Sequence, residues 1–387
     1  MTTQIINGTV LMPSGKWLEN ASVLIEDSKI KSINSGSEVV ADKVIDARGG
    51  YVMPGGIDLH VHGGGGADFM EATREAFVTA AEAHRRHGTT SILPTMASST
   101  VESMHRAAKV CDELMADPRT GILGLHFEGP YFAPKMAGGQ IPENIHLPDP
   151  AEYHEFVEKY PSIKRWDASP ELPGALEFAS YMSSKGVIAG LAHTAATAKE
   201  VEDGYNAGFS LATHFFNAMT TSHKVGPYKH EGTVEGVLLI DDFDVEVIAD
   251  GIHVPAPMLK LLHKIKGTDH VCLVTDAQAC SASNTDKAFD PRVVIYNGVC
   301  MLADHSAIAG SCATMDRLIR TYVQEAGVPL SDVARMASET PARVMGIFDR
   351  KGSLAPGKDA DMMIMDKDLN LTHVVMMGEE VDLTAGA

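Results

Sequence analysis

Two histidines stand two residues apart in the most distinctive stretch of the sequence, residues 54–66. Apolar and polar residues alternate in the run IDLHVH (residues 57–62), a pattern typical of a β-strand. Because successive side chains of a strand point to opposite faces, His60 and His62 are expected on the same face. Two imidazoles placed in this way can share a divalent metal ion, or one ion of a close pair. Four glycines follow at residues 63–66 and allow a sharp turn beside the histidines.

Further side chains that bind metals or carry protons end other candidate strands. They are Glu128, His193, His214 and Asp276. A lone buried histidine is usually a packing residue. Several carboxylates and imidazoles at corresponding strand ends are not explained by packing, because burying each without a partner or a metal costs several kcal/mol. The pattern therefore predicts a metal centre.

The elements that must position these residues are strands alternating with helices. The candidate strands cover residues 57–62, 91–95, 124–128, 163–169, 187–193, 211–217, 245–250 and 271–276. Between them, apolar residues recur with a helical period, most clearly at residues 73–87. This order predicts an α/β fold with a TIM-like (β/α)8 barrel, whose active site lies at the carboxyl ends of the strands. A doubly wound sheet is disfavoured because no GxGxxG motif opens a first helix.

The two ends of the chain differ from this middle part. Residues 1–52 and 351–387 contain short candidate strands separated by turns. We expect both ends to build one small β-sandwich domain, and residues 53–350 to form the barrel.

The composition of the chain limits its expected binding partners and its expected cellular compartment. The chain has 387 residues and a net charge of −19, with no basic run, so a nucleic-acid or anionic membrane partner is not expected. Five cysteines occur without a CxxC pair, which indicates reduced thiols in the cytoplasm. The first residues show no signal peptide, and no long apolar run predicts a membrane helix.

Several motifs together resemble the N-acetylglucosamine-6-phosphate deacetylase family of the amidohydrolase superfamily. The resemblance extends from about residue 50 to residue 365. It is carried by PGGIDLHVHGGGG (54–66), LHFEGP (125–130), AHTAAT (192–197), THFFNAM (213–219), IADGIHVP (248–255), LVTDA (273–277) and GSLAPGKDADMMI (352–364). It implies a (β/α)8 metal-dependent hydrolase that cleaves the N-acetyl amide of an amino sugar 6-phosphate to acetate and the free amino sugar phosphate.

The resemblance also implies a role for each matched residue. Glu128, His193 and His214 match the main metal site, and His60 and His62 match a second site that only some members use, with Glu128 bridging. One or two divalent ions are therefore expected, zinc ahead of iron(II), manganese or cobalt. Asp276 matches the catalytic acid and base.

His253 matches the contact to the acetyl carbonyl of the substrate. The remaining expected substrate contacts are Gly139, Gln140, Asn217, Ala218, His230, Asp250, Ile308, Ala309, Gly310 and Ser311. The family is typically a homodimer in which one subunit completes the substrate pocket of its neighbour.

Two departures from the family pattern concern the phosphate. His230 stands where the family has a phosphate-binding arginine, and Gln140 where it has a histidine. An arginine fork binds phosphate bidentately, and neutral His or Gln does not replace it. Either a lysine (Lys135, Lys224 or Lys229) supplies the charge, or the substrate is an unphosphorylated or differently substituted N-acetyl amino sugar. The choice between glucosamine and galactosamine epimers stays open.

Two other functions are weighed against this one. Many cyclic-amide hydrolases of the superfamily bridge two metals with a carboxylated lysine at the end of the fourth strand, where this chain has Trp166, Asp167 and Ser169. A non-catalytic scaffold would have lost metal ligands, whereas every matched ligand position is kept.

Overall fold

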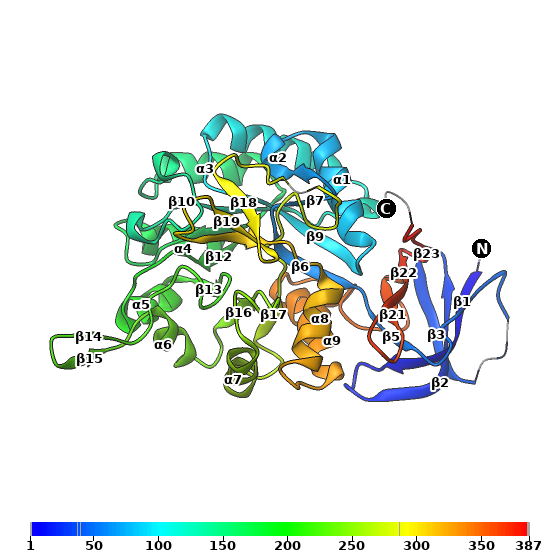
Figure 1. The fold of residues 1–387 in the computed structure, drawn as a ribbon. Coiled ribbons are helices and arrows are strands. Elements are labelled where there is room, and N and C mark those ends of the chain that lie inside the picture. The colour runs from blue at the N-terminus through cyan, green and yellow to red at the C-terminus, as the bar shows by residue number, and fades with distance from the viewer. Residues whose placement is uncertain (1, 37, 39, 286, 385–387) are drawn as a thin grey trace.

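The chain forms a barrel of strands and helices and a separate sheet built from both of its ends (Figure 1). This computed structural model describes residues 2–36, 38, 40–285 and 287–384. Of the predicted terminal segments, residues 1, 37, 39 and 385–387 lie outside the described residues.

Eight parallel strands make the barrel and confirm the predicted fold class. In their order around the sheet they are β6 (Gly56–Val61), β9 (Thr89–Met96), β10 (Leu125–Tyr131), β11 (Ile163–Ala168), β12 (Ile188–Leu191), β13 (Phe209–Ala212), β16 (Asp244–Val247) and β17 (Val271–Leu273). The segment after β17 closes the ring onto β6: the amide of Asp276 donates to the carbonyl of His60 at 2.9 Å, and that of His62 to the carbonyl of Ala277 at 2.8 Å.

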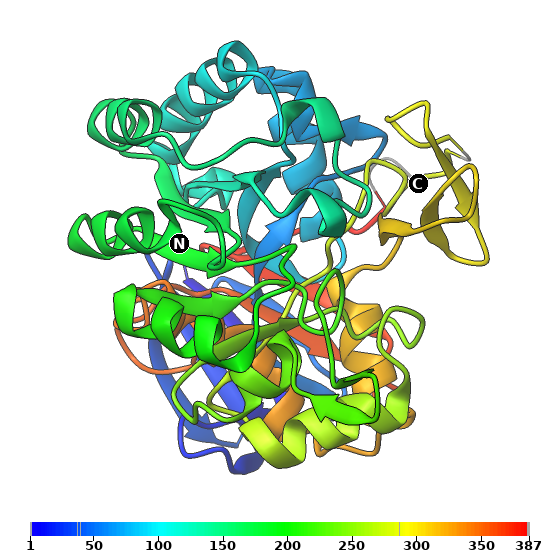
Figure 2. The same cartoon turned by 90° about the vertical axis from the view of Figure 1, so that its left-hand side faces the viewer.

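Helices cover the outside of this ring (Figures 1 and 2). They are α1 (Arg74–Arg85), α2 (Val101–Met115), α3 (Pro150–Lys159), α4 (Ala175–Ser184), α5 (Ala198–Ala207), α6 (Thr233–Leu238), α7 (Ala256–Lys266), α8 (Met315–Gln324) and α9 (Leu330–Val344). Side-chain caps mark several starts: the hydroxyl of Thr73 accepts from the amide of Ala76 before α1, and Thr197 and Glu200 form a capping box at α5. Among the described residues, no helix is long and apolar enough to cross a membrane.

Strands from both chain ends pair in one eight-stranded sheet. They are β1 (Thr2–Leu11), β2 (Trp17–Glu26), β3 (Lys29–Ser35), β4 (Lys43–Asp46), β5 (Tyr51–Pro54), β21 (Met362–Met365), β22 (Leu371–Met376) and β23 (Glu379–Glu380). The antiparallel pair β5–β21 joins the two ends. Ile5, Val23 and Ile364 belong to a hydrophobic core of this sheet, distinct from that of the barrel.

Several smaller elements are inserted between the strands and helices of the barrel. A three-stranded sheet, β18 (Val293–Tyr296), β19 (Val299–Leu302) and β20 (Ile308–Ser311), follows the eighth barrel strand, and we call it the flap. A hairpin of β14 (His223–Val225) and β15 (Tyr228–His230) projects from the body (Figure 1). The remaining short pieces are β7 (Gly63–Gly64), β8 (Ala67–Asp68), η1 (Phe69–Glu71), η2 (Pro118–Thr120), η3 (Pro134–Met136) and η4 (Pro142–Asn144).

Candidate metal centre

Side chains from five barrel strands meet at one mouth of the barrel. His60 and Glu128 lie within β6 and β10, whereas His193, His214 and Asp276 follow the ends of β12, β13 and β17. The last three have positive φ angles of 45°, 32° and 46°. A non-glycine residue in this region costs about 1–3 kcal/mol and persists only where the surrounding structure imposes it. Backbone strain is thus present at three residues whose side chains turn into the site.

The first cluster contains Glu128, His193 and His214. Glu128 Oε1 lies 3.0 Å from Nε2 of each histidine, and the two Nε2 atoms are 3.2 Å apart. His193 Nδ1 lies 2.8 Å from the carbonyl oxygen of Met136, which can only accept, so Nδ1 carries a proton. A neutral His193 then presents the lone pair of Nε2 to a carboxylate oxygen, and these two acceptors repel unless a cation lies between them. A divalent ion satisfies all three groups, and the donor set fits one.

The electrostatics of this cluster also call for a cation. Although burial lowers it, the hydrogen bond with Glu128 raises the pKa of His214 to about 9. The pKa of Glu128 is held well below its usual range by His193, His214 and His62, against the effect of burial. The cluster therefore attracts a positive charge, and a metal ion replaces the proton that would otherwise bind there.

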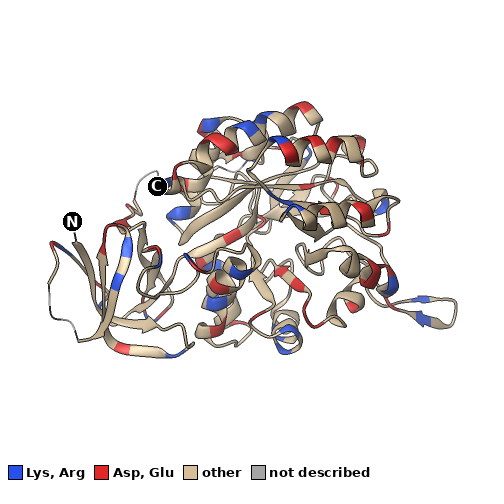
Figure 3. Cartoon of the chain, turned by 180° about the vertical axis from the view of Figure 1, so that it is seen from behind, with Lys and Arg blue, Asp and Glu red and all other residues tan. Residues whose placement is uncertain are grey.

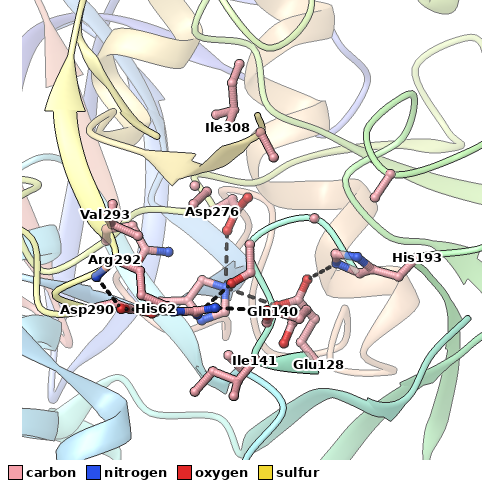
Figure 4. Close-up of a pocket in the computed structure, with 18 of the residues that line it drawn as sticks. His62, Glu128, Gln140, Ile141, His193, Asp276, Asp290, Arg292, Val293 and Ile308 are labelled. Carbon is pink, nitrogen blue, oxygen red and sulfur yellow. Dashed lines mark hydrogen bonds and ion pairs between the residues drawn. The ribbon is translucent and has the colours of Figure 1, made fainter. Parts of the chain in front are cut away.

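The second cluster contains His60, His62 and Asp276. The two Nε2 atoms are 3.2 Å apart, and Asp276 Oδ1 lies 3.2 Å from Nε2 of His62 and 3.5 Å from that of His60. Glu128 Oε2 is 3.3 Å from Nε2 of His62, so the two carboxylate oxygens of Glu128 face different clusters (Figure 4). Each of these oxygens could therefore serve a different ion.

A buried charged network lies beneath the second cluster, and sequence reasoning missed it. Arg165 is fully buried and donates to Asp167 Oδ1 at 2.9 Å, to Glu246 Oε2 at 3.0 Å and to Thr213 Oγ1 at 2.8 Å. Although burial raises it, Arg165 and His60 bring the pKa of Glu246 down to about 2. Glu246 is therefore an anion, and its Oε2, 3.4 Å from His60 Nδ1, orients that ring. Arg165 and Asp167 stand two residues apart on one strand and so share a face. This spacing was the sequence signal from which the network could have been predicted.

Replacing Arg165 with methionine is expected to lower the free energy of unfolding by about 3–5 kcal/mol, because Asp167 and Glu246 would stay buried without their cation. Chemical denaturation followed by circular dichroism measures this loss. Arg106→Met, at an exposed helical pair with Glu102, is the matched control and should change the value by less than about 1 kcal/mol. Equal stability of the two variants would contradict a structural role for the network.

The mouth opens into a cavity of about 960 Å³. Most of the predicted substrate contacts line it: Gly139, Gln140, Asn217, Ala218, His253, Ile308, Ala309 and Gly310. Ser311 and Asp250 are buried and lie outside the described lining. Ser311 Oγ donates to the carbonyl of Thr275 at 2.5 Å, which fastens the flap to the eighth barrel strand.

His253 and Gln140 have contacts that refine their predicted roles. Nδ1 of His253 lies 2.7 Å from Asp250 Oδ2, and its Nε2 is buried without a hydrogen-bond partner among the described residues. That nitrogen is therefore free for a ligand group. Gln140 donates to Glu128 Oε2 at 2.7 Å and accepts from the amide of Ser98 at 2.7 Å, so it touches the Glu128 carboxylate and also lines the cavity (Figure 4).

The side chains considered for binding the phosphate lie in two places, the cavity and the hairpin. His230, Lys224 and Lys229 lie on the exposed hairpin β14–β15, which carries lysines and no acidic residue (Figure 3), and none of them is among the described cavity-lining residues of this chain. Lys135 does line the cavity, and no hydrogen bond or ion pair engages its amine in the described part of the chain.

Arg292 also lines the cavity and was not anticipated, because it lies in an irregular loop without a recognisable pattern. Its guanidinium donates to Asp290 Oδ2 at 2.6 Å and to the carbonyl oxygens of Gly139 at 3.0 Å and Gln140 at 3.3 Å (Figure 4). Arg292 thus joins the flap side of the cavity to the loop that carries Gln140.

Comparison with known proteins places this site in a family. A model described as "Amidohydrolase family" matches residues 51–384. An N-acetylglucosamine-6-phosphate deacetylase of Bacillus subtilis is 30% identical over 383 residues, covering 97% of this chain and 96% of the relative. An N-acetylgalactosamine-6-phosphate deacetylase of Escherichia coli is 30% identical, with 97% and 99% covered.

The fold is also similar to that of a solved structure. The crystal structure of N-acetylglucosamine-6-phosphate deacetylase from Pasteurella multocida superposes with a TM-score of 0.92 at 30% identity, covering 98% of this chain and 99% of that one. The likeness therefore includes the barrel, the flap region and the sheet formed by both chain ends.

Proposed function

The chain belongs to the N-acetylglucosamine-6-phosphate deacetylase family of amidohydrolases, and on that premise we propose that it hydrolyses the N-acetyl amide of an amino sugar 6-phosphate to acetate and the free amino sugar phosphate. The observation that carries this proposal is the position of Asp276. Its carboxylate lies 3.2 Å from His62, beside the bridging Glu128, and lines the same cavity as His253.

The activity depends on a divalent metal ion, for which the two clusters offer the ligands. When bound, such an ion lowers the pKa of water toward neutrality and polarises a carbonyl. Zinc is the ion we propose, since imidazole and carboxylate ligands suit it.

The residues of the chain supply the proton transfers. Asp276 accepts a proton from the attacking water as the oxygen–carbon bond forms, and it returns that proton to the amide nitrogen as the carbon–nitrogen bond breaks. His253 is held by the contact of its Nδ1 with Asp250, and its Nε2, which has no partner among the described residues, can contact the acetyl oxygen on which negative charge develops. The cavity holds the sugar between the loop at Gly139 and the flap residue Ile308.

Replacing both His60 and His62 with asparagine is expected to lower the bound zinc by one ion per chain, because the second cluster loses two of its three ligands. Elemental analysis after loading with zinc and dialysis measures this change. A double variant with unchanged metal content would contradict a metal site at the second cluster. The pair His223→Asn and His230→Asn, on the exposed hairpin, controls for adventitious binding by histidines.

For the phosphate we propose Lys135. Replacing it with alanine should raise KM for the 6-phosphate substrate roughly 10- to 100-fold, since a hydrogen bond to a charged group contributes about 1.5–3 kcal/mol. KM for the unphosphorylated N-acetyl sugar should stay unchanged. Lys109→Ala, on α2, serves as the control for loss of a lysine. A rise in KM with Lys229→Ala instead would indicate that the hairpin of a neighbouring subunit holds the phosphate.

The substrate itself is tested by comparing acetate release from N-acetylglucosamine, N-acetylgalactosamine and their 6-phosphates. We expect kcat/KM to be at least about tenfold higher for a phosphorylated sugar. Equal values with and without phosphate would favour the alternative of an unphosphorylated substrate. That alternative is supported by His230 lying outside the described cavity lining and by the engagement of Gln140 with Glu128.

We also propose that the protein forms a homodimer and is located in the cytoplasm. Exposed apolar side chains on α7 and near it support a subunit contact: Leu239, Ile252, Met258, Leu261 and Ile265. The five cysteines are free thiols, as expected in a reducing compartment.

A further inference from the structure

Three cysteines that are far apart in the sequence meet beside the flap. The Sγ atom of Cys280 lies 3.3 Å from that of Cys300 and 3.4 Å from that of Cys312, and the last two are 3.9 Å apart. Cys280 and Cys300 are 7% and 0% exposed. The proposed deacetylation uses none of the three.

The spacing of these sulfur atoms matches a shared ion. Thiolates bound to one ion at about 2.3 Å with tetrahedral angles lie about 3.8 Å apart. The Cys300–Cys312 separation of 3.9 Å fits this value, and the separations of 3.3 and 3.4 Å from Cys280 are shorter. Thiolate sulfur is a soft ligand that selects zinc or copper(I) over magnesium, calcium or manganese. A fully protonated cluster would have only weak S–H donors to hold the three sulfurs together.

An ion would bind the three sulfur atoms as thiolates, and its binding would displace their thiol protons to solvent.

We propose that Cys280, Cys300 and Cys312 form a further, structural metal site that binds one thiophilic ion, represented by Zn²⁺. The site is separate from the two clusters at the barrel mouth, whose ligands are imidazoles and carboxylates.

The position of the three cysteines indicates a structural role for the bound ion. Cys280 follows the eighth barrel strand four residues after Asp276, Cys300 lies in β19, and Cys312 follows β20 directly. The bound ion ties the flap, which contributes Val293 and Ile308 to the cavity lining, to the segment that carries the proposed proton carrier. Occupation of the site therefore holds the flap side of the cavity in place.

Cobalt(II) tests the site without reference to activity, because cobalt–thiolate bonds give intense near-ultraviolet charge-transfer absorption that imidazole and carboxylate ligands do not give. Reduced full-length protein loaded with Co²⁺ and dialysed should show this band. It should also hold one more equivalent of cobalt than Cys312→Ser or Cys300→Ser. Cys111→Ala, at a buried cysteine of α2, is the matched control and should keep both the band and the extra equivalent.

Hydrogen exchange provides an independent measurement. Backbone amides of β19 and β20 should exchange more slowly after loading in the wild-type protein, and not in Cys312→Ser. The proposal is overturned if reduced wild-type protein shows no thiolate band, or if both serine variants keep it. It is also overturned if mass spectrometry finds a disulfide within the cluster in protein kept under reductant.

Discussion

Asp276→Asn is expected to retain the metal ion of the Glu128 cluster and to lower kcat at least about 1,000-fold. The side-chain amide of asparagine has nearly the shape of the aspartate carboxylate. However, it can neither accept the proton of the attacking water nor return it to the leaving nitrogen. General acid–base catalysis by one positioned group contributes about 10²–10⁴-fold, and here the same carboxylate would serve in both steps. Acetate release and elemental analysis of the same sample measure both quantities.

Asp304→Asn, on the turn between β19 and β20, is the control for the substitution and should leave kcat unchanged. If Asp276→Asn kept activity within tenfold of the wild type while holding its metal, Asp276 would not be the proton carrier. Loss of the second-cluster ion alone, with activity kept, would instead assign Asp276 a purely ligating role in that cluster.

Glu128→Gln is expected to lower zinc affinity at least about 100-fold and to remove activity together with the metal. Loss of an outer partner of a ligand already costs 10–100-fold in affinity, and Glu128 itself faces both clusters through its two oxygens. A competition titration with a chelator measures the affinity. Excess zinc should restore only a small part of the turnover, because the neutral amide cannot bridge two ions as the carboxylate does.

The matched control is Glu143→Gln, at a carboxylate that also lines the cavity but lies outside both clusters. It should bind zinc as the wild type does. Unchanged zinc affinity in Glu128→Gln would contradict the assignment of the first cluster as the main metal site.

The fold could be read from local patterns because a barrel strand and its helix each carry their own period. The alternation around His60 and the apolar period of residues 73–87 identify a strand and a helix without knowledge of any distant contact. Since parallel strands of a barrel end at one mouth, the residues at those ends also predicted where His193, His214 and Asp276 would gather. The structure brings them together, and their catalytic roles stay predictions.

Contacts between distant segments could not be predicted in this way. Arg165 and Glu246 are 81 residues apart, and only the closed ring places them under His60. His214 has a left-handed backbone and lies between Thr213 and Phe215, whose amides donate to the distant carbonyls of Leu191 and Glu246. Cys280 and Cys300 meet because the flap folds back on the eighth strand.

The sequence alone thus determined the eight barrel strands, the helix at residues 73–87 and the chemical groups at the strand ends, since these follow from residue type and spacing along the chain. Only the tertiary structure decided that Glu128 faces two clusters, that Lys135 lines the cavity while His230 lies on an exposed hairpin, and that three scattered thiols converge. These outcomes depend on loop paths and ring closure, which are set by packing between segments far apart in the chain and leave no periodic signal within any one of them.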